Sequence, residues 1–405
     1  MTTTTLHQSH VYRLYPTPEQ ASVLSAWVGA VRVVYNLALQ QRRIWSRPGR
    51  RITYYMQANE LPALRAEVDW IKAVPSQPLQ QALKDLDQSF QRFFDGVSDF
   101  PTNRVLGKND SMRFPTPAHC PIQRLGRRVG SIRIPKLGMV RLRWDKAVPG
   151  RVRNITIRRH AGCWYASVMY HRVIPTPTPS TLPLVGVDRG VRHLAALSTG
   201  VLMSPRSAGK AAARRLRRAQ RRLARKVKGS NRYQQALLRV QRIHARIARM
   251  RKDHAHKLTH YLAKNHGVVV LEKLNIQQMT RSAAGTSAEP GTKVAQKSGL
   301  NRSILDRGWG MVEVYLGYKM HAMGGQVARV PAPYTSQRCA ACGHVDKASR
   351  AADRFRCTAC GHQAHADINA AINIHHRWTE SLNQQDCMPA GHAGDARGGN
   401  ALAGP

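Results

Sequence analysis

Hydrophobic residues recur at two different periods along this chain, and the change of period separates its parts. Residues 10–16 (HVYRLYP) are predicted to form a short strand. Thr17-Pro18-Glu19-Gln20 then begins a helix that should run to about Trp45, because Thr with Gln three residues later and Pro at the first helical position form a capping signal. After Ser76, apolar residues are spaced by four and three positions, which predicts a helix with one core face. That face consists of Leu79, Leu83, Leu86, Phe90 and Phe93.

Between about Met112 and Tyr170 the period falls to two, which is typical of strands with one buried face. In SIRIPKLGMVRLRW the apolar residues share one face, while Arg141 and Arg143 lie on the other. The runs RVRNITIRR and CWYASVMYHR continue the alternation, with Gly and Pro between them. Several short strands of this kind predict a small antiparallel barrel. Its outward arginines either line a groove for a phosphate backbone or form a solvated face, and the pattern leaves both open.

A proline-rich stretch, IPTPTPSTLP (174–183), has no apolar period and is predicted to be the main domain boundary. Beyond it, LVGVDRGVRHLAALSTG should form a hairpin-like pair of strands and HGVVVLEKL a buried strand. A helix over about 301–323 leads into the strand QVARVPAPY. The small, polar segment 282–299 should be a mobile loop, and residues 379–405, which drift into Gly, Ala and Asn, a disordered tail.

Residues 206–252 contain 18 Lys or Arg and no Asp or Glu. Two apolar stripes at helical spacing, separated by a Gly-Ser-Asn turn, predict a basic helical hairpin. Such a surface is either a solvated helix face or a contact for nucleic acid. The lack of acidic residues leaves its charge unneutralised, which favours nucleic acid.

The charge of the whole chain points the same way. Lys and Arg number 64 and Asp and Glu 22, which gives a net charge of +42, and a protein this basic attracts polyanions. No run approaches the roughly 20 apolar residues that span a bilayer, and the start, MTTTTLHQSHVYR, lacks the pattern of a secretory signal. We therefore expect a cytoplasmic, nucleoid-associated protein of two or three domains that does not enter a membrane. A basic membrane-surface protein is the alternative.

Four of the seven cysteines fall within 22 residues, as Cys339-x2-Cys342 and, fourteen residues later, Cys357-x2-Cys360. Four thiolates from two such turns, each followed by Gly, match a tetrahedral Zn²⁺ site. Because four protein ligands close the coordination sphere, the zinc should be structural and not catalytic. A redox dithiol pair is the competing interpretation. His344 and His362 follow the glycines, and we expect them not to be ligands.

Three acidic residues are conspicuous in a chain with so few. Asp188 ends the apolar strand of LVGVDRGVR, Glu272 ends that of VVVLEKLN, and Asp367 precedes the helical run NAAINI. Carboxylates from two strands and a helix fit a ribonuclease-H-like nuclease site, where divalent ions activate water and stabilise the leaving oxygen. Mg²⁺ or Mn²⁺ suits such a site. Any one of these acids alone would more often be a surface or capping residue. Strand alternation should turn Arg189, directly after Asp188, to the opposite face.

The order of the motifs GVDRGV, VVLEKLN, YTSQRCAACG, FRCTACG and HADINAAINI resembles that of the TnpB family, the transposon-encoded RNA-guided nucleases related to compact type V CRISPR effectors. The resemblance extends over about residues 10–378, and TSQ-x-C-x2-C-G followed by D-x-N-A-A-x-N-I is its most specific part. It implies that Asp188, Glu272 and Asp367 are a RuvC-type catalytic triad. It also implies that the four cysteines form a zinc ribbon inserted before the last acid.

The resemblance implies an α+β multidomain fold. A wedge β-barrel (1–16 and 101–175) would be interrupted by a helical recognition domain (17–100). A linker (174–183) would lead to a RuvC-like α/β nuclease domain (184–334 and 364–378) that contains the zinc ribbon (335–363). The family binds a guide RNA derived from the transposon end, recognises a short motif beside its double-stranded DNA target, and cuts both strands at one site.

Three functions remain open at this stage. The first is an RNA-guided, metal-dependent DNA endonuclease, which the intact triad favours. The second is an RNA-guided DNA-binding regulator that does not cut, as in family members that lost triad acids. The third is a transposase or an accessory of one, although no tyrosine–histidine pair suited to covalent strand transfer is evident. The oligomeric state is open as well.

Overall fold

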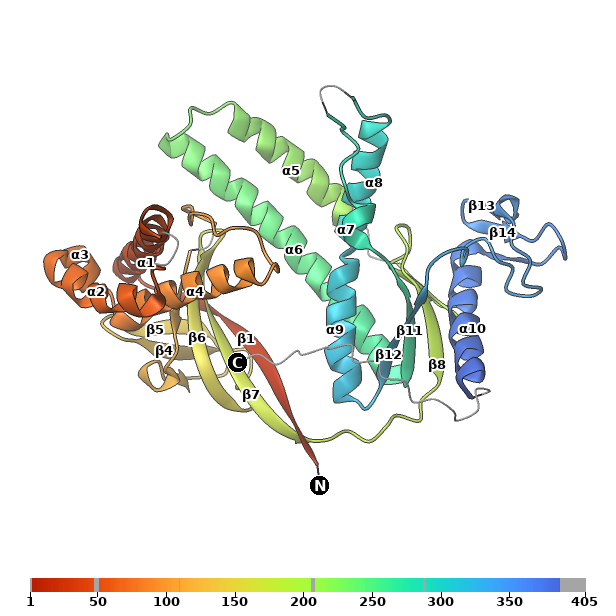
Figure 1. Cartoon of the computed structure of the whole chain (residues 1–405), viewed down its shortest axis with the longest axis horizontal. Helices are drawn as coiled ribbons and strands as arrows, with labels where there is room; N and C mark the ends of the chain where they lie inside the picture. Colours follow the sequence, from red (N-terminus) through yellow and green to blue (C-terminus); the bar gives the residue numbers. More distant parts are fainter. Residues whose placement is uncertain (1, 47–50, 109, 205–207, 287–288, 387–405) are drawn as a thin grey trace. The chain divides into compact units, whose positions relative to one another are not determined.

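The computed structural model describes residues 2–46, 51–108, 110–204, 208–286 and 289–386 of the chain (Figure 1). It divides into two compact units, residues 1–176 with 213–246 and residues 177–212 with 247–405. One division therefore follows Thr176, within the proline-rich stretch, and another falls inside the long helix α6 (Asn231–Asn265).

The first unit is built on a seven-stranded antiparallel sheet with the order β2-β6-β7-β1-β5-β4-β3. Its longest pairing joins β1 (Thr3–Tyr15) to β7 (Cys163–Pro175). Among the described residues, the end strands β2 and β3 do not pair with each other, so the pairings define a sheet without closing it into a barrel. The other strands are β2 (Ser111–Phe114), β3 (Ile122–Arg124), β4 (Val129–Ile134), β5 (Gly138–Arg143) and β6 (Arg151–His160).

The period-two pattern is confirmed in β5, where Val140 and Leu142 are buried and Arg141 and Arg143 are exposed. The short strand predicted over 10–16 is wrong in its start. Strand β1 begins at Thr3, because β7 pairs with it from Thr3 to Leu14.

Besides parts of α6 and of the helix before it, this unit contains α1 (Pro18–Trp45), α2 (Tyr54–Glu67), α3 (Asp69–Lys72) and α4 (Ser76–Phe94). The capping box of α1 is confirmed, because Gln20 N donates to Thr17 Oγ1 at 3.3 Å and Thr17 N donates to Gln20 Oε1 at 3.1 Å. The core face of α4 is confirmed as well. Its Leu79, Leu83, Leu86 and Phe90 are buried, and Phe93 is half-buried.

Helix α1 corrects the expectation that no segment could span a bilayer. Among the described helices it alone is long and apolar enough to cross a membrane. Half of that apolar stretch is buried inside the protein, and nine residues of the helix, Leu24 and Leu39 among them, join the core of the unit. The helix is therefore a core helix by its packing.

The second unit contains a five-stranded mixed sheet with the order β10-β9-β8-β11-β12. Strands β8, β11 and β12 are parallel, and β9 pairs antiparallel with β8, which confirms the predicted hairpin-like pair. These strands are β8 (Leu184–Asp188), β9 (Ala195–Leu197), β10 (Leu202–Met203), β11 (Val268–Lys273) and β12 (Gln326–Pro331).

Helices cover both faces of this sheet. On one face, Val269 and Leu271 pack with Leu262 of α6 and Leu316 of α9 (Trp309–Ala322). On the other, Val270 and Val330 pack with Ile374 of α10 (Ala366–Asp386). Apolar residues on both faces are typical of parallel strands buried between two helical layers.

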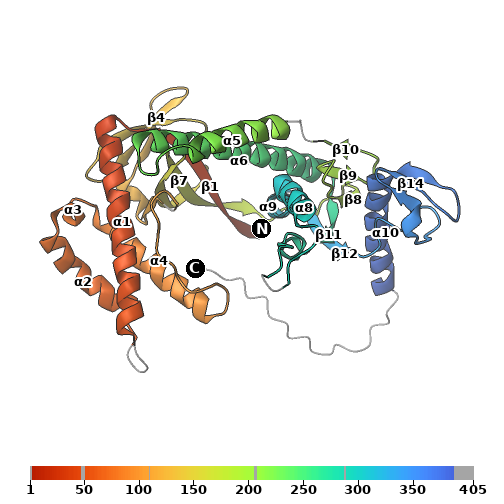
Figure 2. The same ribbon diagram turned by 90° about the horizontal axis from the view of Figure 1, so that it is seen from above.

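The predicted basic hairpin is present as α5 (Ala208–Ala224) and α6, which lie side by side in both views (Figures 1 and 2). A turn with Gly229 at φ 89° joins them. By contrast, the single helix predicted over 301–323 is two helices, α8 (Val294–Arg307) and α9. Gly308 at φ 65° ends the first in the left-handed conformation that glycine adopts without strain. The short helix α7 (Ile276–Met279) precedes α8.

The four cysteines belong to a segment that we call the cysteine ribbon, residues 335–363. It contributes to a three-stranded sheet of β13 (Arg350–Ala351), β14 (Arg354–Arg356) and β15 (Gln363–His365).

The disordered tail predicted from residue 379 is wrong for residues 379–386, which continue α10. Glu380 in this part pairs with Arg338 at 3.0 Å. Residues 387–405 lie outside the described part. The loop predicted over 282–299 is partly helical, since α8 begins at Val294.

Leu86→Ala should destabilise the first unit by about 2–5 kcal/mol, because it leaves a cavity at a fully buried core position. Gln88→Ala, at an exposed position of the same helix, is the matched control and should change the free energy of unfolding by less than about 0.5 kcal/mol. Chemical denaturation of both variants provides the measurement. Equal stability of the two would contradict the core assigned to α4.

Candidate active site and metal centre

Two of the predicted acids lie at one edge of the mixed sheet. Strands β8 and β11 are parallel and in register, with Val187 opposite Leu271. The next residue along each strand is an acid, Asp188 and Glu272 respectively. Because the carboxyl ends of parallel strands meet at the same sheet edge, the two side chains are neighbours although 84 positions separate them in the sequence.

The third acid, Asp367, is in the first turn of α10, which packs against β8 (Figure 1). This packing is close at Gly186, where a Cβ atom would clash with the carbonyl oxygen of Ala371 and lie 2.7 Å from the backbone nitrogen of His375. Any larger residue at position 186 would push α10 away from the sheet and take Asp367 with it. The glycine in LVGVD is therefore required by a close helix–strand contact.

All three carboxylates line one open cavity of about 540 Å³. The structure thus brings together the three acids that the sequence singled out. Their role as metal ligands stays a prediction. The cavity is also lined by Thr335 and Arg350 of the cysteine ribbon.

Two of these carboxylates, Asp188 and Glu272, have a raised pKa. Burial, then the negative charges of Glu272 and Asp367, raise the pKa of Asp188 from 3.8 to about 7. Burial also raises the pKa of Glu272, against the opposing effects of the Thr335 hydroxyl and nearby arginines. Crowded, partly desolvated carboxylates of this kind are unfavourable when ionised, and a bound cation relieves both the repulsion and the lost hydration.

The donors fit a hard divalent cation. Three carboxylates offer only oxygen atoms, which Mg²⁺ and Mn²⁺ prefer, and the cavity leaves space for water and a phosphate group. Two ribbon residues already orient these carboxylates. Arg350 Nη2 donates to Asp367 Oδ1 at 3.0 Å, and the Thr335 hydroxyl donates to Glu272 Oε1.

Arg189 directly follows β8 and lines the same cavity as the acids, so strand alternation does not separate it from them completely. Its guanidinium has a partner that the sequence did not reveal. Its guanidinium is buried and donates to Glu313 Oε2 of α9 at 3.2 Å and to the backbone carbonyl of Glu272 at 2.6 Å. Neither acceptor is a carboxylate of the three cavity acids. Glu313 is missed by sequence reasoning, because one acid in an amphipathic helix looks like a solvated residue.

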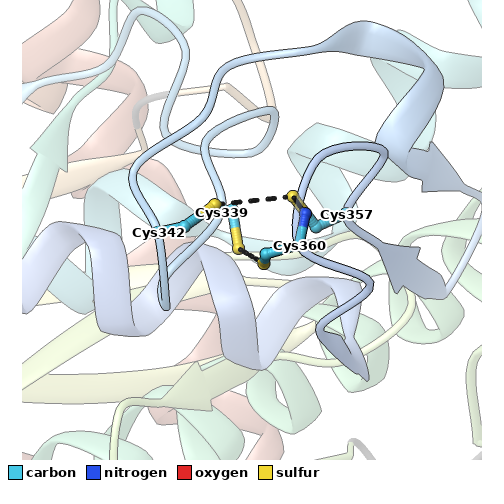
Figure 3. A group of neighbouring side chains, drawn as sticks. All are labelled: Cys339, Cys342, Cys357 and Cys360. Carbon is cyan, nitrogen blue, oxygen red and sulfur yellow. Dashed lines mark hydrogen bonds between the residues drawn. The ribbon is translucent and has the colours of Figure 1, made fainter.

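The four cysteines form a second centre (Figure 3). Their sulfur atoms all lie within 4.8 Å of one another, with Cys339 and Cys360 at 3.8 Å and Cys342 and Cys357 at 3.6 Å. Tetrahedral Zn²⁺ with bonds of about 2.3 Å requires sulfur separations of about 3.8 Å, whereas a disulfide requires about 2 Å. The geometry therefore fits zinc and not a redox disulfide.

The backbone of each turn prepares these sulfurs. Gly343 and Gly361 follow the second cysteine of each pair with φ of 77° and 72°. The backbone N–H of Cys360 points to Cys357 Sγ and lowers the pKa of that thiol to about 6, which favours the thiolate that zinc binds. His344 and His362 each accept a backbone hydrogen bond through their carbonyl groups, and their rings are not part of the sulfur cluster.

Two buried asparagines of the D-x-N-A-A-x-N-I motif connect this centre to the acids. Asn369 accepts from Ala340 N at 2.9 Å and donates to the Arg338 carbonyl at 2.8 Å. Asn373 donates to the carbonyls of Thr335 and Arg338 at 2.9 and 2.6 Å. The first cysteine turn is therefore tied to the helix that presents Asp367.

A histidine pair beside Asp367 was also missed. The rings of His193 and His365 are 5.3 Å apart, and each offers a nitrogen within 4.8 Å of an Asp367 oxygen. His193 Nδ1 is 2.8 Å from Ser204 Oγ, and His365 Nδ1 accepts from the backbone N–H of Asp367 at 3.2 Å. The HAD motif places one histidine near the acid, but only the fold brings His193 there.

The structure described so far is that of a mixed α/β protein with a carboxylate cavity and a four-cysteine ribbon. Comparisons with known proteins identify its family. A family model described as "Probable transposase" matches residues 167–283, "Cas12f1-like, TNB domain" matches 309–374, and "Helix-turn-helix domain" matches 1–49. In this structure the described part of that last stretch is strand β1 followed by helix α1.

Two relatives match over most of the chain. "Putative RNA-guided DNA endonuclease InsQ" of Escherichia coli (strain K12) is 41% identical over 91% of this chain and 91% of its own length. "Putative RNA-guided DNA endonuclease" of Streptomyces pristinaespiralis is 32% identical over 90% of this chain and 87% of its own length. The chain belongs to the TnpB family, as its motifs indicate.

A solved structure supports the fold. The protein in "Cryo-EM structure of the Cas12f1-sgRNA-target DNA complex" has a TM-score of 0.51 and 12% identity, covering 91% of this chain and 98% of that one. At this identity the likeness concerns the fold alone, and it confirms the mixed α/β multidomain architecture.

Cys357→Ser should reduce bound zinc from about one ion per chain to nearly none, because the site then lacks one of its four thiolates. The backbone amides at the start of α10 should exchange faster with solvent, because the cysteine turn that binds Asn369 and Asn373 is then no longer held in place by the metal. Metal analysis and hydrogen exchange at residues 366–373 measure the two effects. Cys163→Ser, outside the ribbon, is the control, and unchanged exchange in zinc-free protein would contradict the link.

Metal binding at the carboxylates should weaken as the pH falls through about 7. Asp188 must be deprotonated to become a ligand, and its pKa is raised to about 7. Below that pKa the Mn²⁺ affinity should fall by up to about tenfold per pH unit. Calorimetric titration with Mn²⁺ at pH 6 and pH 8 measures this, and two buffers of different ionisation enthalpy count the released proton. Equal affinity at both pH values would contradict the assignment.

Proposed function

We propose that this protein is an RNA-guided DNA endonuclease that cuts double-stranded DNA beside a short flanking motif. The observation that carries the proposal is the convergence of Asp188, Glu272 and Asp367 in one cavity of a chain with net charge +42. Carboxylates placed to hold divalent cations are what phosphodiester hydrolysis needs, and the basic chain suits polyanionic partners. Relatives over nine-tenths of the chain are described as RNA-guided DNA endonucleases.

Mg²⁺ or Mn²⁺ would be held by Asp188, Glu272 and Asp367, and when bound it would activate water and stabilise the charge on the leaving oxygen. The chain's own residues prepare this site. Asp188 releases its proton, the Thr335 hydroxyl orients the Glu272 carboxylate, and Arg350 orients Asp367. The Arg350 guanidinium also places a positive charge in the cavity, where it can contact a phosphate oxygen.

The remaining parts have roles under this proposal. Residues 1–16 and 101–175 would be the wedge domain, built on the seven-stranded sheet, and 17–100 the recognition domain. Residues 184–334 with 364–378 would be the RuvC-like nuclease domain, and 335–363 its structural zinc ribbon. The partners are a guide RNA derived from a transposon end and the target DNA duplex. Base pairing reads the sequence, while the protein holds the backbones. The basic hairpin of α5 and α6, which has no Asp or Glu over residues 206–252, is one such backbone contact. The site of action is the bacterial cytoplasm at the nucleoid.

The test is cleavage of matched DNA by protein purified with its bound RNA. Sequencing that RNA identifies the guide, and a target library with randomised flanks identifies the motif. Cutting should require a matched target and Mg²⁺ or Mn²⁺. Asp188→Ala, Glu272→Ala and Asp367→Ala should each reduce cutting by about 10³-fold or more, because each removes several kcal/mol of transition-state stabilisation.

The same variants should still bind matched DNA, because the changes leave the basic surfaces intact. Asp253→Ala, which removes an exposed carboxylate paired with Lys257 on α6, is the matched control and should cut normally. Matched DNA that is bound but never cut at any Mg²⁺ or Mn²⁺ concentration would favour the silent regulator. Cutting at one fixed site without a guide would contradict RNA guidance, and joining of strands would favour the transposase.

A further inference from the structure

A buried arginine directly follows the first acid of the cavity. The Arg189 side chain is 1% exposed, and burial lowers its pKa while the charges of Glu313, Glu272 and Asp188 raise it. A desolvated guanidinium needs negatively charged or carbonyl partners, and breaking its ion pair leaves a costly buried charge. Two of the carboxylates whose charge reaches Arg189 are those that would hold the metal ion. A free guanidinium here would therefore compete with the metal.

The structure directs this guanidinium to other acceptors. Arg189 Nη1 donates to Glu313 Oε2 at 3.2 Å, and Nη2 donates to the Glu272 backbone carbonyl at 2.6 Å. The second bond ties the end of β8 to the end of β11, which fixes the spacing between the two acids. Among the described residues, those that line the cavity do not include Glu313.

Glu313 is itself fixed on two sides. Its other oxygen, Oε1, accepts from Arg329 Nε of β12 at 2.7 Å. Although burial alone would raise the pKa of Glu313, the bond from Arg329 and the charge of Arg189 lower it, so the residue is ionised at neutral pH. Glu313 thus supplies a full negative charge to Arg189 from α9, and no residue of this described helix lines the cavity.

We propose that Glu313 is a positioning residue of the metal site, which holds the Arg189 guanidinium so that Asp188 and Glu272 stay free for a divalent cation. This inference rests on the proposed metal-dependent function of the same cavity. Glu313→Gln keeps the shape and removes the charge. Arg189 then turns to the nearest remaining carboxylates and occupies the place of the cation.

The expected effect is a weaker metal site that recovers when the arginine is also removed. Changes next to metal ligands typically lower metal affinity by about 10- to 100-fold, and Glu313→Gln should do so. The double variant Arg189→Met/Glu313→Gln removes the competing cation and should bind metal more tightly than Glu313→Gln alone. Asp253→Asn likewise removes the charge of an ion-paired carboxylate, here the exposed partner of Lys257. It is the matched control and should stay within about twofold of the parent.

The experiment is equilibrium Mn²⁺ binding by electron paramagnetic resonance on the full chain purified with its RNA. An Asp188→Ala sample measures binding to the RNA and to other sites. Thermal unfolding of each variant in the same buffer identifies any that fail to fold. Parental affinity in Glu313→Gln would overturn the proposal. So would a double variant as weak as Glu313→Gln, because the effect would then not depend on Arg189.

Cleavage gives a second readout that separates this inference from the proposed function. In Glu313→Gln the half-saturating Mg²⁺ concentration for cutting should rise by about the same 10- to 100-fold, with a near-parental rate at saturation. If the parent cuts matched DNA and the variant shows an unchanged metal requirement, the inference fails and the function stands. If the parent binds Mn²⁺ at the site without cutting, the function fails and the Mn²⁺ binding series still tests Glu313.

Discussion

Three carboxylates placed together in one partly buried cavity are the constraint on which the rest of the second unit depends. Burial, and then the negative charges of Glu272 and Asp367, raise the pKa of Asp188 to about 7, so its ionisation there is unfavourable. Neighbouring donors partly offset it, Thr335 on Glu272 and Arg350 on Asp367. These donors neutralise only part of the negative charge of the carboxylates, and the remaining charge favours binding of a divalent cation.

Helix α10 is the structural element that assembles this site. Gly186 lets it approach β8, so that Asp367 reaches the edge where the strands end. On its other side, Asn369 and Asn373 bind the backbone of the first cysteine turn. The four cysteines and the acids are therefore connected through one helix. We expect loss of the cysteine turn to loosen the helix that presents Asp367.

Much of the fold could be predicted because local patterns carried it. The capping box at Thr17 and the apolar stripe of α4 are local signals, and both are confirmed. The errors have non-local causes. Strand β1 is longer than its own alternation indicates because β7 pairs with it, and α10 extends past residue 378 with Glu380 paired to Arg338. The break at Gly308 was a local signal that the helical pattern on both sides concealed.

By itself, the sequence determined which residues can act: scarce acids at strand ends, two cysteine turns of fixed spacing, and a basic hairpin without acids. Covalent order and short-range periodicity suffice for these, because caps, turns and ligand pairs lie within a few residues. Only the tertiary structure decided which of them meet. Arg189 beside Glu313, His193 beside His365 and Arg350 on Asp367 join positions 124, 172 and 17 residues apart. Such contacts depend on how strands and helices pack, and no local pattern encodes that packing.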